Sequence, residues 1–239
     1  MPIAMSSSSN ALLQAVAALY RSSGRFPFFY AQGKLRYDPV LLAVLNSGLI
    51  KNGMTVLDLG CGQGLLFALL RTAESQHQRG LWPDGWPAPP TGLRLQGIEF
   101  RASEVAFARN ALGSSATFTA SDLSCAELPR ADLVILFDVL HYLPAAAQID
   151  LLKRVATALS LGGLLLIREA DAGGGLSFRI TQFAEWFSAI YRSLSGQRFY
   201  FRSRRNWNEI LAGHGFGAED LRMSDGTPFA NLLWVARRV

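Results

Sequence analysis

Apolar residues follow two alternating patterns along most of the chain, short continuous runs and stripes spaced three or four residues apart. The continuous runs indicate strands at residues 54–60, 93–100, 116–123, 131–140 and 162–170. The stripes indicate helices at residues 64–74, 103–112 and 151–159. Near-continuous apolar strands separated by helices are typical of a parallel sheet covered on both faces. We therefore expect an α/β fold.

The C-terminal third departs from this alternation. Residues 217–223 and 231–238 indicate two strands joined by a link short enough for a hairpin, so the last strand should run antiparallel to its neighbours. Before them, apolar residues at 176–194 recur at spacings of three and four, which predicts an amphipathic helix. Ser203 is expected to cap the helix that follows.

The N-terminal region reads less clearly. An apolar stripe at residues 12–20 predicts a helix with Asn10 as its cap and an end near Gly24. Residues 25–39 are dense in aromatic and basic side chains and predict neither a helix nor a strand. Asp38, followed by a proline, marks the start of a further short helix.

These patterns suggest a division of the chain. Residues 1–48 are expected to form a helical cap that covers the substrate. Residues 49–239 are expected to form the main domain, with a lid inserted at about 172–202. The Pro/Trp-rich stretch 78–92 is expected to be a surface insertion.

Composition and charge limit the classes of protein. Half of the residues are apolar and 17% are charged, which is typical of a compact folded domain. The net charge of +5 permits anionic partners such as nucleic acid, an acidic carrier protein or carboxylate substrates, although the basic residues are dispersed. Two cysteines, Cys61 and Cys125, cannot form a disulfide framework, and no Cys/His spacing resembles a metal site. No apolar run reaches the roughly 18 residues of a membrane span, so we expect a cytoplasmic protein without a metal.

The stretch VLDLGCGQG at residues 56–64 carries the strongest chemical signal. Gly60, Gly62 and Gly64 lie between a predicted strand and a predicted helix, where the helix N-terminus favours nucleotides and anions. No lysine follows, which excludes a P-loop, and the spacing GxGxG differs from the GxGxxG of dinucleotide sites. Asp58 would repel a pyrophosphate but would attract a positively charged ligand.

This stretch closely resembles the first motif of class I, Rossmann-like methyltransferases that depend on S-adenosylmethionine (SAM), a ligand with an ammonium group and a sulfonium. The resemblance extends from about Leu57 to Ala170, and the terminal hairpin continues it. It implies SAM as the cofactor, S-adenosylhomocysteine (SAH) as the product, and a seven-stranded sheet that is parallel except for the last strand.

The resemblance also implies roles for single residues. In this family an acid at the end of the second strand holds the ribose hydroxyls, a position that Glu99 occupies here. Asp122 matches the acid that accepts from the adenine amino group, Leu123 matches a backbone contact to the ring, and residues 137–143 match a motif under the methionine part. The expected cofactor residues are Asp58, Gly60, Cys61, Gly62, Gly64, Glu99, Phe100, Asp122, Leu123 and Phe137.

The acceptor is expected at the carboxyl ends of the strands, where open α/β sheets bind ligands. His141 is the candidate general base because the intrinsic pKa of histidine lies near neutrality, although in related enzymes a histidine here also shapes the cofactor site. The expected acceptor contacts are Tyr30, Lys34, Arg36, Asp138, Tyr142, Arg168 and Phe229.

Residues 198–205 combine aromatic side chains with four arginines. Such a segment suits base stacking and phosphate contact, an acidic carrier protein or a membrane surface. Core aromatics beside a solvated basic edge are the simpler interpretation.

The sequence thus predicts methyl transfer to a small, aromatic or apolar acceptor. O-methylation is favoured because the [DNS]PP[YFW] tetrad of N-methyltransferases is replaced by FDVL at 137–140. An RNA methyltransferase, a non-catalytic SAM-binding scaffold and an aminopropyl transferase remain open, as does the oligomeric state. No RNA-binding module is recognisable, so nucleic acid is not the expected partner.

Overall fold

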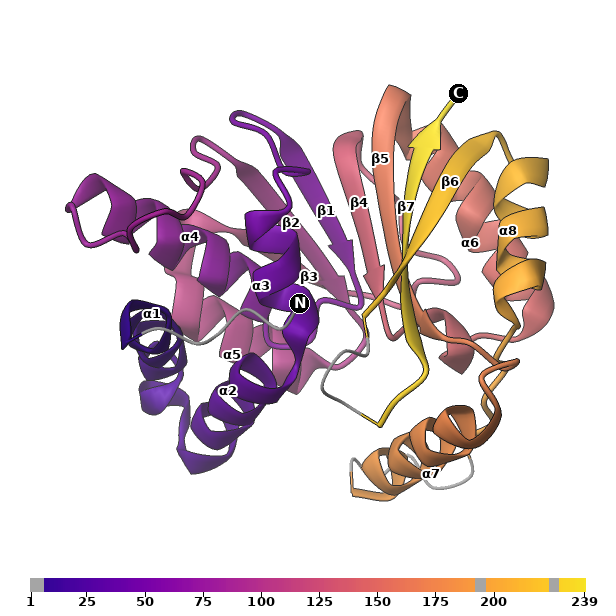
Figure 1. The fold of residues 1–239 in the computed structure, drawn as a ribbon, viewed down its shortest axis with the longest axis horizontal. Coiled ribbons are helices and arrows are strands. Elements are labelled where there is room, and N and C mark those ends of the chain that lie inside the picture. Colours follow the sequence, from indigo (N-terminus) through magenta and orange to yellow (C-terminus); the bar gives the residue numbers. More distant parts are fainter. Residues whose placement is uncertain (1–6, 192–196, 224–227) are drawn as a thin grey trace. The chain divides into compact units, whose positions relative to one another are not determined.

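The computed structural model describes residues 7–191, 197–223 and 228–239. Helices and strands alternate through most of the chain (Figure 1), which confirms the predicted α/β class. The strands are β1 (Thr55–Leu59), β2 (Arg94–Glu99), β3 (Thr117–Ala120), β4 (Ala131–Phe137), β5 (Leu159–Ala170), β6 (Phe216–Arg222) and β7 (Asn231–Arg238). The helices are α1 (Ser7–Ala18), α2 (Arg25–Tyr37), α3 (Pro39–Asn46), α4 (Leu65–Gln78), α5 (Ala102–Leu112), α6 (Ala145–Ala158), α7 (Gly175–Tyr191) and α8 (Arg204–Gly213).

The strands form one sheet in the order β3-β2-β1-β4-β5-β7-β6. Six strands run parallel, and β7 runs antiparallel to β5 and β6. The predicted hairpin and antiparallel last strand are therefore confirmed. The chain divides into two compact units, residues 1–125 and 126–239, which we describe separately.

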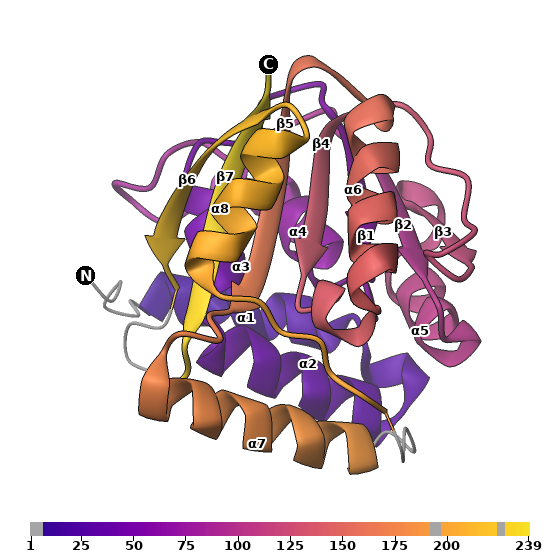
Figure 2. The same cartoon turned by 90° about the vertical axis from the view of Figure 1, so that its right-hand side faces the viewer.

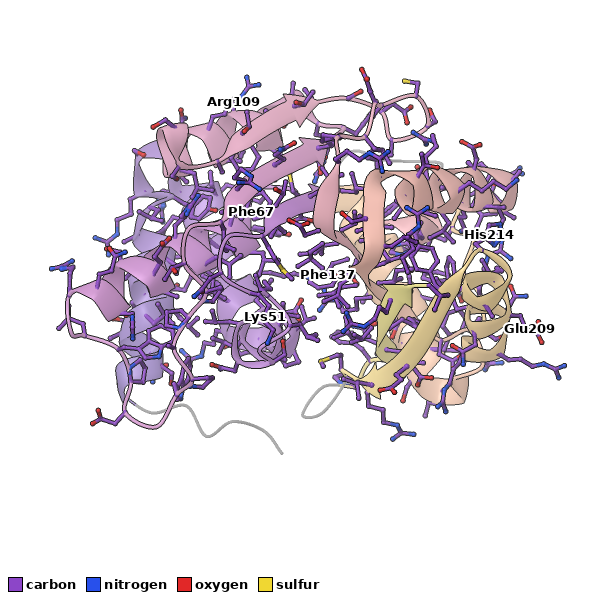
Figure 3. The ribbon with its side chains drawn as sticks, turned by 90° about the horizontal axis from the view of Figure 1, so that it is seen from above. Lys51, Phe67, Arg109, Phe137, Glu209 and His214 are labelled. Atoms are coloured by element: carbon purple, nitrogen blue, oxygen red, sulfur yellow. The ribbon has the colours of Figure 1, made fainter. Side chains whose placement is uncertain are left out.

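The first unit contains β1, β2 and β3 with helices α1 to α5. Strand β2 lies between β1 and β3 and pairs in parallel with both, so that Asp58 stands opposite Gly97 in the register. Helix α4 contributes a continuous buried face, and Phe67 on it packs against Phe118 of β3. Figure 3 shows Phe67 inside this unit and Arg109 of α5 at its edge.

The second unit contains β4 to β7 with helices α6, α7 and α8. Figure 2 shows α6 and α8 on the same face of these strands, where α6 packs on β5 and α8 packs on β6. Strand β5 is buried along its second half because it lies between β4 and β7. The N-cap predicted for α8 is confirmed, since the Ser203 side chain accepts from the backbone N–H of Asn206.

The N-terminal helices differ from the sequence interpretation. Helix α1 begins at Ser7, so Asn10 lies inside the helix and the prediction that it caps the helix is wrong. Residues 25–37 form α2, although no element could be predicted there. Its buried residues Pro27, Ala31 and Leu35 are spaced four apart, which explains the helix. Asp38 caps α3 as expected, with its carboxylate accepting from Val40 N at 3.1 Å.

The predicted lid helix lies at α7, which the structure describes from Gly175 to Tyr191. The end of the predicted helix, at 192–194, and residues 224–227 of the hairpin link fall outside the described residues. The division into a cap at 1–48 and a main domain with a lid at 172–202 stays a prediction.

Candidate functional site

The turn between β1 and α4 is built from glycines with positive φ. Gly60, Gly62 and Gly64 have φ of 78°, 52° and 71°, a region that L side chains rarely adopt. A Cβ at Gly64 would lie 2.9 Å from the ring of Phe118, so this glycine lets α4 approach β3. A Cβ at Gly62 would meet no atom within 4 Å. Gly62 is therefore the position where the turn faces open space.

The carboxylate of Glu99 ties this turn to the end of β2. One of its oxygens accepts from Gly62 N at 3.0 Å, and the other accepts from Arg101 N at 2.9 Å. The Arg101 side chain also contacts Glu99, at 3.2 Å, and reaches Glu104 at 3.6 Å. Glu99 is thus held in a fixed position beside the turn, and its carboxylate keeps acceptor capacity for further hydroxyl groups.

Asp58, the carboxylate before the turn, is only 6% exposed. Within the described part of the chain, no hydrogen-bond donor contacts its oxygens. Burial, and then the charge of Glu99, raise the pKa of Asp58 to about 7. A buried carboxylate without a donor is costly to ionise, and a cationic ligand would offset that cost.

Tyr20, which lies between α1 and α2, contacts the same turn. The Tyr20 hydroxyl donates to the Gln63 carbonyl at 2.8 Å. The pKa of Tyr20 is raised by its burial and further by the neighbouring charges of Cys61, Tyr30 and Glu104. Burial likewise raises the pKa of the Cys61 thiol well above its usual range. Sequence reasoning missed Tyr20 and Gln63, because neither residue type carries a motif.

The expected acceptor residues Tyr30, Lys34 and Arg36 all lie on α2. Tyr30 is near Tyr20 and stacks on Phe26 at 6.1 Å between ring centroids. Lys34 pairs with Asp38 at 2.7 Å, and the Arg36 guanidinium lies over the Tyr37 ring. Tyr30 thus lies near Tyr20, the residue whose hydroxyl contacts the glycine turn.

The residues expected at the adenine lie after β2 and β3. The Phe100 side chain is 67% exposed, so its ring face is accessible. Asp122 accepts from Ser124 N at 2.8 Å, which orders the turn after β3, and Leu123 is buried. The turn thus presents an exposed carboxylate beside a buried apolar residue.

In the second unit, β4 ends in a strained turn. Asp138 is the one non-glycine residue with positive φ in the described chain, at 56°. Its carboxylate accepts two hydrogen bonds from the Arg168 guanidinium, which is 2% exposed and lies 5.7 Å from the centre of the Phe137 ring. The backbone N–H of Asp138 donates to the Arg168 carbonyl at 2.9 Å. These contacts hold Asp138 in a conformation that costs free energy, a feature typical of functional sites.

His141 is 2% exposed and pairs with a buried carboxylate on β5. Its Nδ1 lies 2.7 Å from Glu169 Oε2. Glu169 Oε1 accepts from the backbone N–H groups of Val139, Leu140 and His141 at 3.1, 2.7 and 3.3 Å. Glu169 therefore caps the short 3₁₀ helix Leu140–Tyr142 and orients the imidazole.

Aromatic rings surround His141. The rings of Tyr142 and Phe201 lie 4.4 and 4.8 Å from the imidazole, and Phe199 lies at 5.8 Å. Phe201 also contacts Phe178 of α7 at 5.2 Å. This aromatic group joins α7, residues 199–201 and the 3₁₀ helix. Another expected acceptor residue, Phe229, is partly buried just before β7.

The basic segment 198–205 is largely engaged within its own unit. Arg202 donates to Gln148 and Asn206, and Tyr200 N donates to the His141 carbonyl at 2.8 Å. Arg204 pairs with Asp220 at 2.8 Å. These contacts favour the interpretation of core aromatics beside a solvated edge.

Neither a metal site nor a membrane span is found in the part of the chain that the structure describes. No group of three or more His, Cys, Asp or Glu side chains could hold a metal ion there. No helix among the described residues is long and apolar enough to cross a membrane.

A family model described as a methyltransferase domain matches residues 31–221. Among proteins with curated functions, none matches the chain.

Several solved structures share the fold. The magnesium protoporphyrin IX methyltransferase of Synechocystis PCC 6803, with bound SAH, is 22% identical over 84% of this chain and 80% of its own, with a TM-score of 0.57. A chain from the complex of a methyltransferase activator and a putative methyltransferase of Haloferax volcanii is 17% identical, over 94% of this chain and 96% of its own, with a TM-score of 0.62. An O-methyltransferase family protein of Burkholderia thailandensis is 19% identical, over 100% of this chain and 64% of its own, with a TM-score of 0.63. At these identities the likeness concerns the fold.

Proposed function

Because the chain belongs to the methyltransferase domain family and has the fold of its class I, SAM-dependent members, we propose that it methylates a small aromatic or apolar acceptor. The family and the cofactor follow from the match over residues 31–221. The acceptor class and the residue roles below are our proposal.

One observation carries the cofactor assignment, the buried Asp58 carboxylate before an open glycine turn. Asp58 lacks a donor among the described residues, and Gly62 leaves space for a ligand beside the backbone. The residues present therefore fit a cationic ligand bound at the turn. When bound, SAM supplies a methyl group activated by its positively charged sulfur.

Further residues of the first unit would hold the adenosine part. Glu99, fixed by Gly62 N and Arg101 N, has acceptor capacity for the two ribose hydroxyls. Asp122 is the proposed acceptor for the adenine amino group, with Leu123 and the exposed Phe100 ring contacting the base. Phe137 of the second unit is proposed for the methionine part. Gly60, Cys61 and Gly64 shape the turn.

His141 is the proposed general base for an acceptor hydroxyl. The contact between Nδ1 and Glu169 favours the tautomer with the proton on Nδ1, so that Nε2 is the proton acceptor. Nε2 would take the hydroxyl proton as the acceptor oxygen forms its bond to the methyl carbon; the bond from that carbon to sulfur would break, with its electron pair left on the sulfur of SAH. The carboxylate stabilises the imidazolium that results. This arrangement supports O-methylation.

The aromatic side chains support an apolar acceptor. Phe26 and Tyr30 lie on α2, while Tyr142, Phe199 and Phe201 gather around His141. Asp138, Arg168 and Phe229 are further proposed contacts. An acidic carrier protein and a cytoplasmic location stay predictions.

An RNA methyltransferase and a non-catalytic SAM-binding scaffold are the alternatives. The arginines of segment 198–205 that have described partners are engaged within their own unit, which weighs against RNA. The buried Asp58 is compatible with both the enzyme and a SAM-binding scaffold, so turnover has to distinguish them. Calorimetry that shows SAM binding, with no methyl transfer to any extracted metabolite pool, would support the scaffold.

The cofactor assignment is tested by substituting Gly62 with alanine. A Cβ there meets no protein atom but enters the space proposed for the ligand, so we expect Gly62→Ala to weaken SAM and SAH binding by about tenfold or more in calorimetric titration. Gly85→Ala is the matched control, because Gly85 also has positive φ, 77°, and open space but lies in the 78–92 loop. Both variants carry a similar backbone strain of about 1–2 kcal/mol. Equal SAM affinities of the two variants would contradict the assignment.

A further inference from the structure

The exposed side of helix α2 carries three large aromatic rings. Phe26, Phe29 and Tyr37 are 46%, 54% and 72% exposed. The helix packs against α1 and α3 (Figure 1), and the three residues that it buries lie on its opposite side. Single apolar residues scattered over a surface are normal, but several on one side of one helix indicate an interaction surface.

Arginines accompany these rings. Arg21, Arg25 and Arg36 are exposed, and none of them pairs with an acid among the described residues. The chain has no Asp or Glu before Asp38, which pairs with Lys34 at 2.7 Å. Arg21 and Arg25 lie at the N-terminal end of α2, where positive charge opposes the helix dipole. The arginines therefore do not stabilise the helix, and they suit an anionic partner.

The rings and the arginines of α2 occupy different edges of its exposed side. Each residue turns an α-helix by about 100°, so that Arg25 and Arg36 lie along one edge while Phe26, Phe29 and Tyr37 lie beside them. A helix that lies in a membrane surface needs this separation. Its rings enter the boundary between headgroups and acyl chains, and its arginines extend sideways to the phosphates.

The polar groups of this side favour a lipid surface over a protein partner. A specific protein interface needs directional donors and acceptors as well as apolar area. Gln32 is the one amide on the exposed side of α2, and no carboxylate lies there. Rings and positive charge without such a pattern match a surface that is negative and apolar but not sequence-specific.

We propose that the exposed side of α2 docks on an anionic lipid surface. The rings of Phe29 and Tyr37 enter the headgroup boundary, and Arg21 and Arg25 contact lipid phosphates. This docking does not depend on methyl transfer. One consequence rests on the proposed function: a site for an apolar acceptor is brought to the phase in which apolar molecules dissolve.

Vesicles test the docking without SAM or an acceptor. The probes are vesicles of phosphatidylcholine alone and vesicles in which about one-third of the lipid is phosphatidylglycerol. The ring variant combines Phe29→Gln with Tyr37→Gln, and the arginine variant combines Arg21→Gln with Arg25→Gln. Glutamine is polar and favours helices, so α2 should persist in both. If the ring variant does not fold, Phe29→Gln alone replaces it.

The matched control removes one apolar residue and one arginine elsewhere. It combines Leu81→Gln with Arg79→Gln, at exposed positions just after α4. In flotation measurements, we expect the wild type to bind the anionic vesicles and not the neutral ones. The ring variant and the arginine variant should each bind about tenfold more weakly, or worse, and the control should change by less than about twofold. All variants should keep the SAM affinity of the wild type in solution.

Other results would overturn the docking in distinguishable ways. Equal vesicle binding by the ring variant and the wild type would mean that charge alone attracts the protein. An equal loss in the control would mean that α2 is not the surface. A wild type that binds poly-glutamate or poly-uridylic acid but no vesicles would instead have an acidic protein or RNA as its partner. Failure of the wild type to bind SAM would contradict the proposed function and leave the docking unaffected.

Discussion

Asp58 links the stability of the ligand-free protein to the binding of its proposed ligand. Its carboxylate is buried, has no donor among the described residues, and has a pKa of about 7 because of burial and then Glu99. An unfolded chain ionises the same group near pH 4. Folding therefore takes up a proton between pH 4 and pH 7, so this residue lowers stability as the pH rises through that range.

Substituting Asp58 with asparagine should separate these two effects. The asparagine side chain is neutral at every pH, so we expect Asp58→Asn to melt at a higher temperature than the wild type at pH 8, with the difference vanishing toward pH 4. The difference between the pKa of about 7 in the folded protein and the pKa near 4 in the unfolded chain corresponds to at most roughly 4 kcal/mol of unfolding free energy at pH 8. The same variant should bind SAM more weakly, because the ammonium group of SAM loses its carboxylate partner. The affinity of the wild type for SAM should rise from pH 6 to pH 8, because Asp58 becomes ionised over this range.

Thermal melts and calorimetric titrations at several pH values measure both effects. Asp84→Asn, at an exposed position in the 78–92 loop, is the control. Lower stability of Asp58→Asn at pH 8, or SAM affinity independent of pH in the wild type, would show that Asp58 is not the titrating group.

At the scale of residues, the sequence predicts the glycines and Asp58, since their spacing alone carries the motif. Glu99 could be predicted only by resemblance, and the structure shows the Gly62 N–H bond that explains its place beside the turn. Gln63 and Tyr20 could not be predicted. The Tyr20 hydroxyl reaches the Gln63 carbonyl across 43 positions of the chain, a contact that no local sequence pattern indicates.

At the scale of elements, Glu169 connects β5 to the short 3₁₀ helix that carries His141. One of its oxygens accepts hydrogen bonds from three backbone N–H groups, and the other contacts an imidazole nitrogen. The carboxylate thus stabilises a helix N-terminus and orients the proposed base at the same time.

Two substitutions of Glu169 should distinguish these roles. Glu169→Ala leaves every donor without an acceptor, and we expect it to lower the free energy of unfolding by about 3–5 kcal/mol in urea titrations. Glu169→Gln keeps one acceptor oxygen and should cost about 1–3 kcal/mol. If His141 is the base, Glu169→Gln should also lower kcat and shift the pH–rate profile of the folded enzyme.

Glu209→Gln is the control for this pair, because Glu209 is exposed on α8 (Figure 3) and pairs only with nearby Arg205 among the contacts described. A pH–rate profile of Glu169→Gln identical to that of the wild type would confine Glu169 to a structural role. It would also contradict His141 as the general base.

The sequence predicts an element well when the element is buried against the sheet on one or both of its faces, because burial leaves a clear pattern of apolar residues. Strands β1, β4 and β5 are buried along most of their length and read as continuous apolar runs. Helix α2 was not predictable, because Phe26 and Phe29 on it are largely exposed and obscure the spacing of its three buried residues. The start of α1 at Ser7 was missed because a polar run without apolar spacing gives no helical signal.

At the scale of the whole molecule, the net charge of +5 raises the question of a nucleic-acid partner. In the second unit, Arg202, Arg204 and Arg205 contact Gln148, Asp220 and Glu209. Arginines engaged in this way would have to give up these contacts to bind phosphates. Segment 198–205 is thus better explained as a solvated edge than as a nucleic-acid surface.

The final prediction follows from this distribution of charge and from the aromatic rings around His141. Incubation of the protein with methyl-labelled SAM and a cell extract should place the label in the organic-solvent fraction, because the proposed acceptor is small and apolar. The RNA and protein precipitates should carry no more label than in a parallel incubation with Gly62→Ala, which weakens cofactor binding. Mass analysis of the labelled product then identifies the acceptor and the methylated atom. Label in RNA, together with an RNA affinity that falls steeply with salt, would instead support the RNA methyltransferase.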